Sequence, residues 1–86
     1  MECVVDVPEK RDGEGMRFVW DPGYEIAIAV TGSEISIRAN RAGLVSLARH
    51  LLTLAQESAR VGSHVHLTAG QEIDSEFDLI LELSEE

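Results

Sequence analysis

The stretch YEIAIAVTGSEISIRANRAGLVSLARHLLTLAQESARVG, residues 24–62, decides the fold, because its hydrophobic period changes once along its length. Apolar and polar residues first alternate along residues 24–30 and again along residues 33–39, which is typical of half-buried β-strands. The link Gly32-Ser33 is short enough for a tight turn, so the two segments are predicted to form a β-hairpin. Apolar residues then recur every three or four positions, which predicts one long helix over about residues 41–60.

Sequence signals mark both ends of the predicted helix and one face of it. Asn40 fits the N-cap position, where a side-chain oxygen accepts a hydrogen bond from a free amide of the first turn. Gly62 fits the left-handed position that ends many helices. Gly43 costs about 1 kcal/mol of helix propensity relative to alanine, so we predict that it allows close packing. We expect Leu47 and Leu51 to face the sheet.

Strand patterns also occur on either side of this region. Alternation resumes after the helix in SHVHLT and in SEFDLILELS, and weaker candidates, ECVVDV and MRFVW, precede the hairpin. The sequence therefore predicts a single small α+β domain over residues 1–86. Its two layers would be an antiparallel or mixed sheet of four to six strands and the long helix packed on one face. A chain of 86 residues supports one modest core and leaves little room for a deep active site.

Composition excludes several classes of partner and location. The chain has 16 acidic residues against 7 Lys and Arg, a formal net charge of −9, whereas nucleic-acid binding requires a basic surface. The apolar run IAIAV is too short to span a membrane. The first residues, MECVVDVPEK, do not resemble a signal peptide. A single cysteine, Cys3, cannot form an internal disulfide, so we expect a cytoplasmic protein.

Acidic residues are concentrated near the C-terminus, where residues 71–86 contain seven acids and no Lys or Arg. This bias either keeps the protein soluble or steers it toward a cationic partner, since a field of one sign raises association rates. Trp20 and Ile80 could serve as apolar anchors in such a complex, although core or edge packing is the competing role for Trp20. The candidate partner-binding residues are Glu72, Asp74, Glu76, Asp78, Glu82, Trp20 and Ile80.

His64 and His66 are weak candidates for a metal site. Val65 and Leu67 are expected to face the helix, so strand alternation places the two histidines together on the other face, about 6.5–7 Å apart. A zinc site needs three or four ligands, and His50 belongs to the helix in the opposite layer. We therefore predict exposed polar side chains and no metal. The carboxylates that could share that face are those of Glu25, Asp78 and Glu82.

The sequence contains no recognisable enzyme motif. The Walker phosphate-binding loop, the G-x-G-x-x-G fingerprint and the nucleophile elbow G-x-S-x-G are all missing. Acid–base catalysis requires a pocket and a shifted pKa, and a domain built from one helix and one sheet offers little of either. We therefore expect neither catalysis nor a cofactor.

Three segments of the sequence share a recognisable pattern: ISIRANRAGLVSLARHLLTLA, then VGSHVHLTAG, then FDLILEL. Over roughly residues 34–83 they resemble the immunity protein 32 family of bacterial polymorphic-toxin systems. Their shared features are a strand ending in Asn, a Gly-Leu helix start, a helix rich in Leu and Ala, and an H-x-H-x strand before a closing acidic hairpin. The resemblance implies a small α+β domain that binds and neutralises a toxin made by the same cell.

Two functions remain in competition. In the first, the protein is a non-catalytic toxin inhibitor whose acidic surface occludes a cationic active-site cleft. In the second, it is a structural or regulatory domain that dimerises through its open sheet face. Ala27, Ala29 and Ile80 would leave a flatter, less polar patch on that face.

Overall fold

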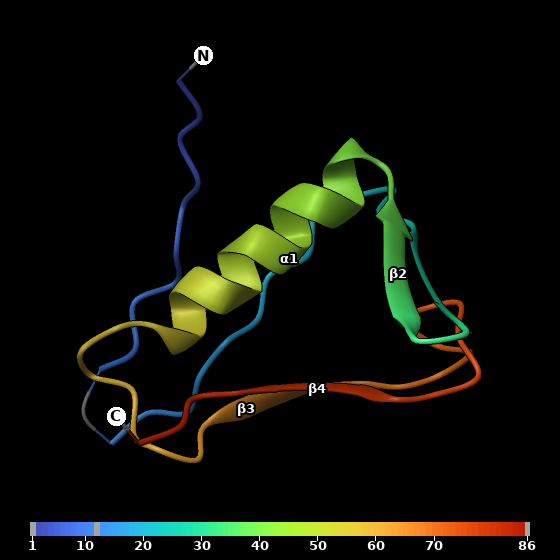
Figure 1. The fold of residues 1–86 in the computed structure, drawn as a ribbon. Helices are drawn as coiled ribbons and strands as arrows, with labels where there is room; N and C mark the ends of the chain where they lie inside the picture. Colours follow the sequence, from blue (N-terminus) through green and yellow to red (C-terminus); the bar gives the residue numbers. More distant parts are fainter. Residues whose placement is uncertain (1, 12, 86) are drawn as a thin grey trace.

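The structure, a computed structural model, describes residues 2–11 and 13–85. Its helix and strands confirm the predicted α+β class, and α1 forms a layer above β3 and β4 (Figure 1). Within the described residues, no helix is both long enough and apolar enough to cross a membrane. The elements, in chain order, are β1 (Ile26–Thr31), β2 (Glu34–Ala39), α1 (Arg41–Leu54), β3 (His64–Leu67) and β4 (Leu79–Glu82).

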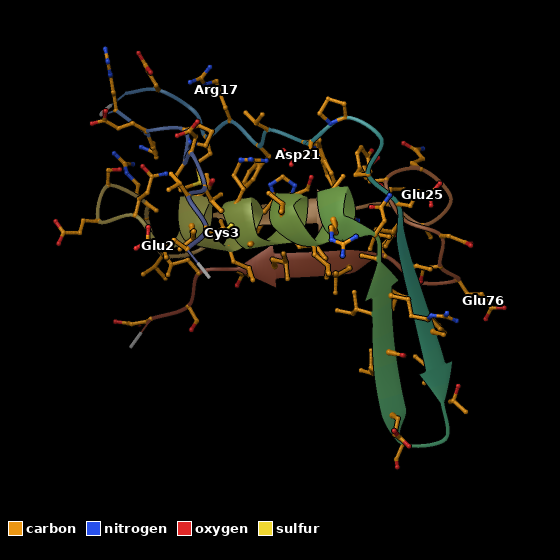
Figure 2. The ribbon with its side chains drawn as sticks, turned by 90° about the horizontal axis from the view of Figure 1, so that it is seen from above. Glu2, Cys3, Arg17, Asp21, Glu25 and Glu76 are labelled. Carbon is orange, nitrogen blue, oxygen red and sulfur yellow. The ribbon has the colours of Figure 1, made fainter. Side chains whose placement is uncertain are left out.

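The strands form two antiparallel two-stranded sheets, β1–β2 and β3–β4, so the prediction of one sheet of four to six strands is only partly matched. A loop segment occupies the edge of β1 that a further strand would need. The N–H of Ile28 donates to the carbonyl of Asp74 at 2.9 Å, and the N–H of Asp74 donates to the carbonyl of Ile26 at 2.8 Å. The hairpin projects beyond α1 and the second sheet (Figure 2).

The β1–β2 hairpin has the predicted turn and a fully apolar face. Thr31 pairs with Glu34 across the Gly32-Ser33 link, and Gly32 has φ +61°, the positive value that a type II′ turn requires at this position. Because residues directly opposite each other share a face, the register separates apolar from polar side chains. The apolar face of the hairpin consists of Ile26, Ile28, Val30, Ile35, Ile37 and Ala39.

Helix α1 begins where the sequence predicts and ends earlier. The side-chain oxygen of Asn40 accepts from the N–H of Gly43 at 2.8 Å, which confirms the N-cap. The last helical residue is Leu54, and the N–H of Ala55 donates to carbonyls in the last turn. The predicted end near residue 60 is therefore wrong. Gly62, with φ +93°, lies instead in the turn before β3.

The buried face of α1 is more polar than its hydrophobic spacing predicts. Ser46, His50 and Thr53 are fully buried, whereas Leu51 is 53% exposed. Leu47 packs against the core, so the expectation that both leucines face the sheet is correct only for Leu47. The polar face is buried because a long N-terminal segment covers it.

This N-terminal segment, residues 6–11 and 13–24, runs alongside α1 and is called here the N-terminal strap (Figure 2). The guanidinium of Arg49 donates to the carbonyls of Asp6 at 2.9 Å and Val19 at 3.3 Å, and it pairs with the Asp21 carboxylate at 2.7 Å. The N–H of Asp21 also donates to the Ser46 hydroxyl at 2.8 Å. In the described ranges, residues 2–7 and 16–20 contain no strand, so both N-terminal strand candidates are wrong.

Aromatic side chains of the strap pack around the buried histidine of α1. The His50 ring meets Trp20 edge-on, with ring centroids 4.4 Å apart, and Phe18 in the same way at 5.5 Å. Tyr24 lies 4.4 Å from Trp20 on a tilted plane. These contacts join the strap to the small core. The buried apolar residues of that core are Ile26, Leu54, Val65, Leu67 and Ile73.

Candidate partner-binding surface

The outer face of β3–β4, defined by His64, His66, Asp78, Ile80 and Glu82, carries several of the predicted residues. His64 lies opposite Glu82 in the register, and His66 lies opposite Ile80. The predicted alternation is confirmed, because the intervening valine and leucine of β3 are buried while both histidines are exposed. This face therefore presents two imidazoles, two carboxylates and one large apolar side chain to solvent.

Asp78 is held in place by two neighbours on this surface. One carboxylate oxygen accepts from the N–H of Ala69 at 2.8 Å, and the other lies 2.8 Å from the Nε2 atom of His66. The backbone N–H of Ala69 is the main cause that lowers the pKa of Asp78, and the hydrogen bond with His66 adds to it. Asp78 is therefore charged at neutral pH, although part of its charge faces His66.

The two histidines have local partners other than a metal. The Nδ1 atom of His64 lies 3.1 Å from the carbonyl of Gly62, while His66 contacts Asp78. Across residues 2–11 and 13–85, no cluster of three or more His, Cys, Asp or Glu side chains is arranged to hold a metal ion. Of the other candidate ligands, His50 is buried in α1 and Cys3 lies at the exposed N-terminal end.

The loop that connects β3 to β4 holds three further predicted acids. Glu72 is half-buried, and its carboxylate accepts from the N–H of Thr68 at 2.9 Å. Asp74 pairs with β1 through its main chain, which leaves its carboxylate exposed. Glu76 is exposed and lies on the outer side of this loop (Figure 2). The structure therefore leaves Asp74 and Glu76 available to a partner and gives Glu72 a role within the loop.

An open groove of about 680 Å³ is lined by this loop and by the base of the hairpin. Glu72 and Asp74 line one side, and Arg38 lines the hairpin side. Arg38 was not among the predicted site residues, although strand alternation in the sequence already places it on the polar face of the hairpin. The groove combines charges of both signs and is open to solvent, so it can accept a polar side chain of a partner.

The two predicted apolar anchors lie in different surroundings. Trp20 is half-buried in the N-terminal strap between Tyr24 and His50 and packs against the core. Ile80 is 53% exposed on the outer face of β3–β4, beside Glu82 in the alternation of β4. The structure therefore brings Ile80 together with acidic residues and assigns Trp20 a packing contact along α1.

The patch expected for the alternative function does not lie on one sheet. Ala27 and Ala29 belong to the polar face of the hairpin, whereas Ile80 belongs to the second sheet. A feature that the sequence interpretation missed is the exposure of the apolar hairpin face, where Ile35 is 73% and Ile37 is 49% exposed. The alternation signal was present, but it does not tell which apolar faces are covered.

Of the comparisons with known proteins, the one with protein families gives a match. No curated protein and no solved structure matches the chain significantly. The model of the family Immunity protein 32 matches residues 34–85, from the start of β2 to beyond the end of β4. The matched residues make up more than half of the chain. They include α1, the outer face of β3–β4 and the acids of the loop. This chain therefore belongs to the immunity protein 32 family.

Proposed function

We propose that this protein is a non-catalytic immunity protein of a bacterial polymorphic-toxin system. It acts in the cytoplasm by binding and neutralising a cognate toxin through an acidic surface. The observation that carries the proposal is membership of the immunity protein 32 family, which implies a protein partner.

The charge of the described surface supports an acidic binding face. Asp74, Glu76 and Glu82 are exposed, and none of these carboxylates makes a hydrogen bond or ion pair to another described side chain. They lie in a stretch of sequence, residues 71–86, that has no Lys or Arg. Such a field attracts a basic cleft and raises the encounter rate, an effect that salt screens over about 8 Å at physiological ionic strength.

The chemistry of the surface supports inhibition rather than catalysis. A general acid or base works best when its pKa lies near the operating pH. The pKa of Asp78 is instead lowered from its ordinary value, and the acids of the loop face solvent or bond to main-chain amides. These groups are suited to forming charge-assisted hydrogen bonds with a partner.

The test compares two variants with equal net charge. The acidic-surface variant carries Asp74→Asn, Glu76→Gln and Glu82→Gln. The control variant carries Glu2→Gln, Glu9→Gln and Glu14→Gln, three exposed changes outside the acidic loop and β4. Association and dissociation rates are measured over a range of salt with the toxin domain encoded beside this gene. We expect slower association for the first variant at low salt and near wild-type rates for the control.

Three results would count against the proposal, each in a different way. Equal association rates for both variants would show that the acidic bias serves only solubility, and the acidic surface would be rejected. Failure of the wild-type protein to bind the neighbouring toxin or to restore growth of cells expressing it would reject the immunity function for that pair. Hydrolysis of the toxin or of its substrate by the purified protein would reject the non-catalytic role.

A further inference from the structure

Strand β2 has a free outer edge. Its described hydrogen-bonded neighbour is β1, whereas the far edge of β1 is already occupied by the segment around Asp74. Residues 34–38 are all exposed, and the hairpin projects beyond the rest of the molecule (Figure 2). An exposed edge strand presents unpaired N–H and C=O groups that can pair with another strand.

The hairpin geometry determines which groups of β2 point outward. In a hairpin with a two-residue turn, the residues flanking the turn form a hydrogen-bonded pair, here Thr31 and Glu34. Hydrogen-bonded pairs then alternate along an antiparallel ladder. The main-chain groups of Glu34, Ser36 and Arg38 therefore point toward β1. Those of Ile35 and Ile37 point to the free edge.

The residues of β2 are arranged so that this edge complements itself. The sequence E-I-S-I-R, residues 34–38, is symmetric in polarity about Ser36 and opposite in charge at its two ends. We propose that a second copy of this chain pairs antiparallel with β2, with the two-fold axis at Ser36. Ile35 of each copy then exchanges main-chain hydrogen bonds with Ile37 of the other. Glu34 of each copy lies opposite Arg38 of the other.

The charged pair selects this register and this partner. Glu34 and Arg38 are exposed, and neither makes a hydrogen bond or ion pair to another described side chain. In the proposed pairing they occupy a non-hydrogen-bonded position, where facing side chains approach most closely. Moving either strand by two residues keeps the hydrogen-bond pattern but separates the charges. A second copy supplies both charges at the required places.

The same pairing covers the part of the apolar surface that lies along the β2 edge, where Ile35 of each copy lies beside Ile37 of the other. The two hairpins form a continuous four-stranded sheet with both apolar faces on one side. Val30 and Ile35, which are 52% and 73% exposed, lie near the hairpin tip. Antiparallel pairing brings each tip beside the base of the other hairpin, where Ala39 leads into α1. The dimer therefore places the exposed end of each apolar face next to the apolar base of its partner.

The first experiment is a charge swap measured by sedimentation equilibrium on the chain alone, so it does not depend on the proposed function. The wild-type protein should dimerise. Glu34→Arg and Arg38→Glu should each raise the dimer dissociation constant at least roughly tenfold, because both symmetric pairs become repulsive. The variant with both changes restores opposite charges and should return toward the wild-type constant. Thermal unfolding checks that each variant is folded.

The second experiment locates the axis by disulfide formation in a Cys3→Ser background. Ser36→Cys places two thiols opposite each other at a non-hydrogen-bonded pair, where Cα atoms are about 4.5 Å apart and a disulfide can form. Ala29→Cys is the matched control, because Ala29 is exposed on the same face but lies on β1 opposite Ser36. Mild oxidation should link Ser36→Cys into a dimer and leave Ala29→Cys monomeric.

Several outcomes would overturn the proposal. One is a wild-type protein that stays monomeric at the highest soluble concentration, including the case in which β2 pairs only with a strand of a toxin. Another is a dimer that is insensitive to both single charge reversals, or one that the double swap fails to restore. Equal crosslinking of the Ser36→Cys and Ala29→Cys variants would also place the contact elsewhere.

Discussion

Replacing Gly43 by alanine should destabilise the protein, although alanine is the better helix former. Gly43 lies in the first turn of α1, where the helix meets the base of the hairpin. A Cβ atom added there would lie 2.5 Å from the carbonyl oxygen of Glu25 and 3.0 Å from side-chain atoms of Ala39 and Ile26. The oxygen belongs to the backbone, so the clash cannot be relieved by a change of rotamer.

The expected magnitude follows from two opposing terms. Alanine gains at most about 1 kcal/mol of helix propensity. Overpacking costs typically about 1–3 kcal/mol. Moving α1 away would also weaken the two hydrogen bonds between Asn40 and Glu25, at 3.0 and 3.1 Å, which contribute about 1 kcal/mol each. The free energy of unfolding should therefore fall by about 2 kcal/mol, or roughly 8–16 °C in Tm for a domain of this size.

The assay is urea and thermal unfolding followed by circular dichroism at the helical band. Ala48→Gly is the control, because it makes the opposite exchange in the same helix at a half-buried position. That control should lose about 1 kcal/mol through propensity. If Gly43→Ala were as stable as the wild type or more stable, the close contact between α1 and the hairpin would be refuted.

Three further predictions concern the core, the buried histidine and the strap. Leu67→Ala should lower the free energy of unfolding by about 2–5 kcal/mol, because Leu67 is 0% exposed. Leu51→Ala, at an exposed position, should change it by less than about 0.5 kcal/mol. Equal losses for the two variants would show that the buried face of α1 is misassigned. Burial, and secondarily Arg49, lowers the pKa of His50 below its ordinary value of 6.5. The neutral His50 side chain therefore contributes its full share of stability above pH 6.5, and this contribution falls as the pH decreases below 6.5. When the pH is lowered from about 7.5 to about 5.5, the free energy of unfolding should therefore fall less for His50→Leu than for the wild type. An equal fall in both proteins would contradict the burial of a neutral His50. Arg49→Ala should release the strap from α1 and lower the free energy of unfolding by about 1–3 kcal/mol. It should also shift the fluorescence of the single tryptophan to longer wavelength. The exposed control Arg60→Ala should change neither the unfolding free energy nor the fluorescence.

Local sequence signals predicted the elements that depend on neighbouring residues. The alternation around Gly32-Ser33 predicted the hairpin, and alternation in HVHL predicted which side chains of β3 are buried. Asn40 predicted the start of α1, and Gly43 predicted a close approach of backbone to helix. Apart from the contact of Gly43 with Glu25 and Ile26, each of these features is determined within a few residues of the chain.

The features that depend on distant residues were not predictable in this way. The helix period alone favours a leucine-lined buried face, but Ser46 is buried because it accepts from Asp21 on the strap. The four strands form two sheets because Asp74 takes the edge of β1. The acids of the candidate surface were visible in the sequence, but their division between loop, groove and β4 required the fold.

The attachment of the N-terminal strap has a consequence for how its sequence can change. Many of its hydrogen bonds use main-chain atoms of the strap, at Asp6, Pro8, Lys10 and Val19, and side chains of the helical region, chiefly Arg49 and Gln56. A carbonyl or amide at these places accepts or donates in the same way whatever side chain follows it. At these four positions the strap can therefore change its side chains, apart from a proline at Lys10 that would lack the N–H, while Arg49 and Gln56 keep their contacts.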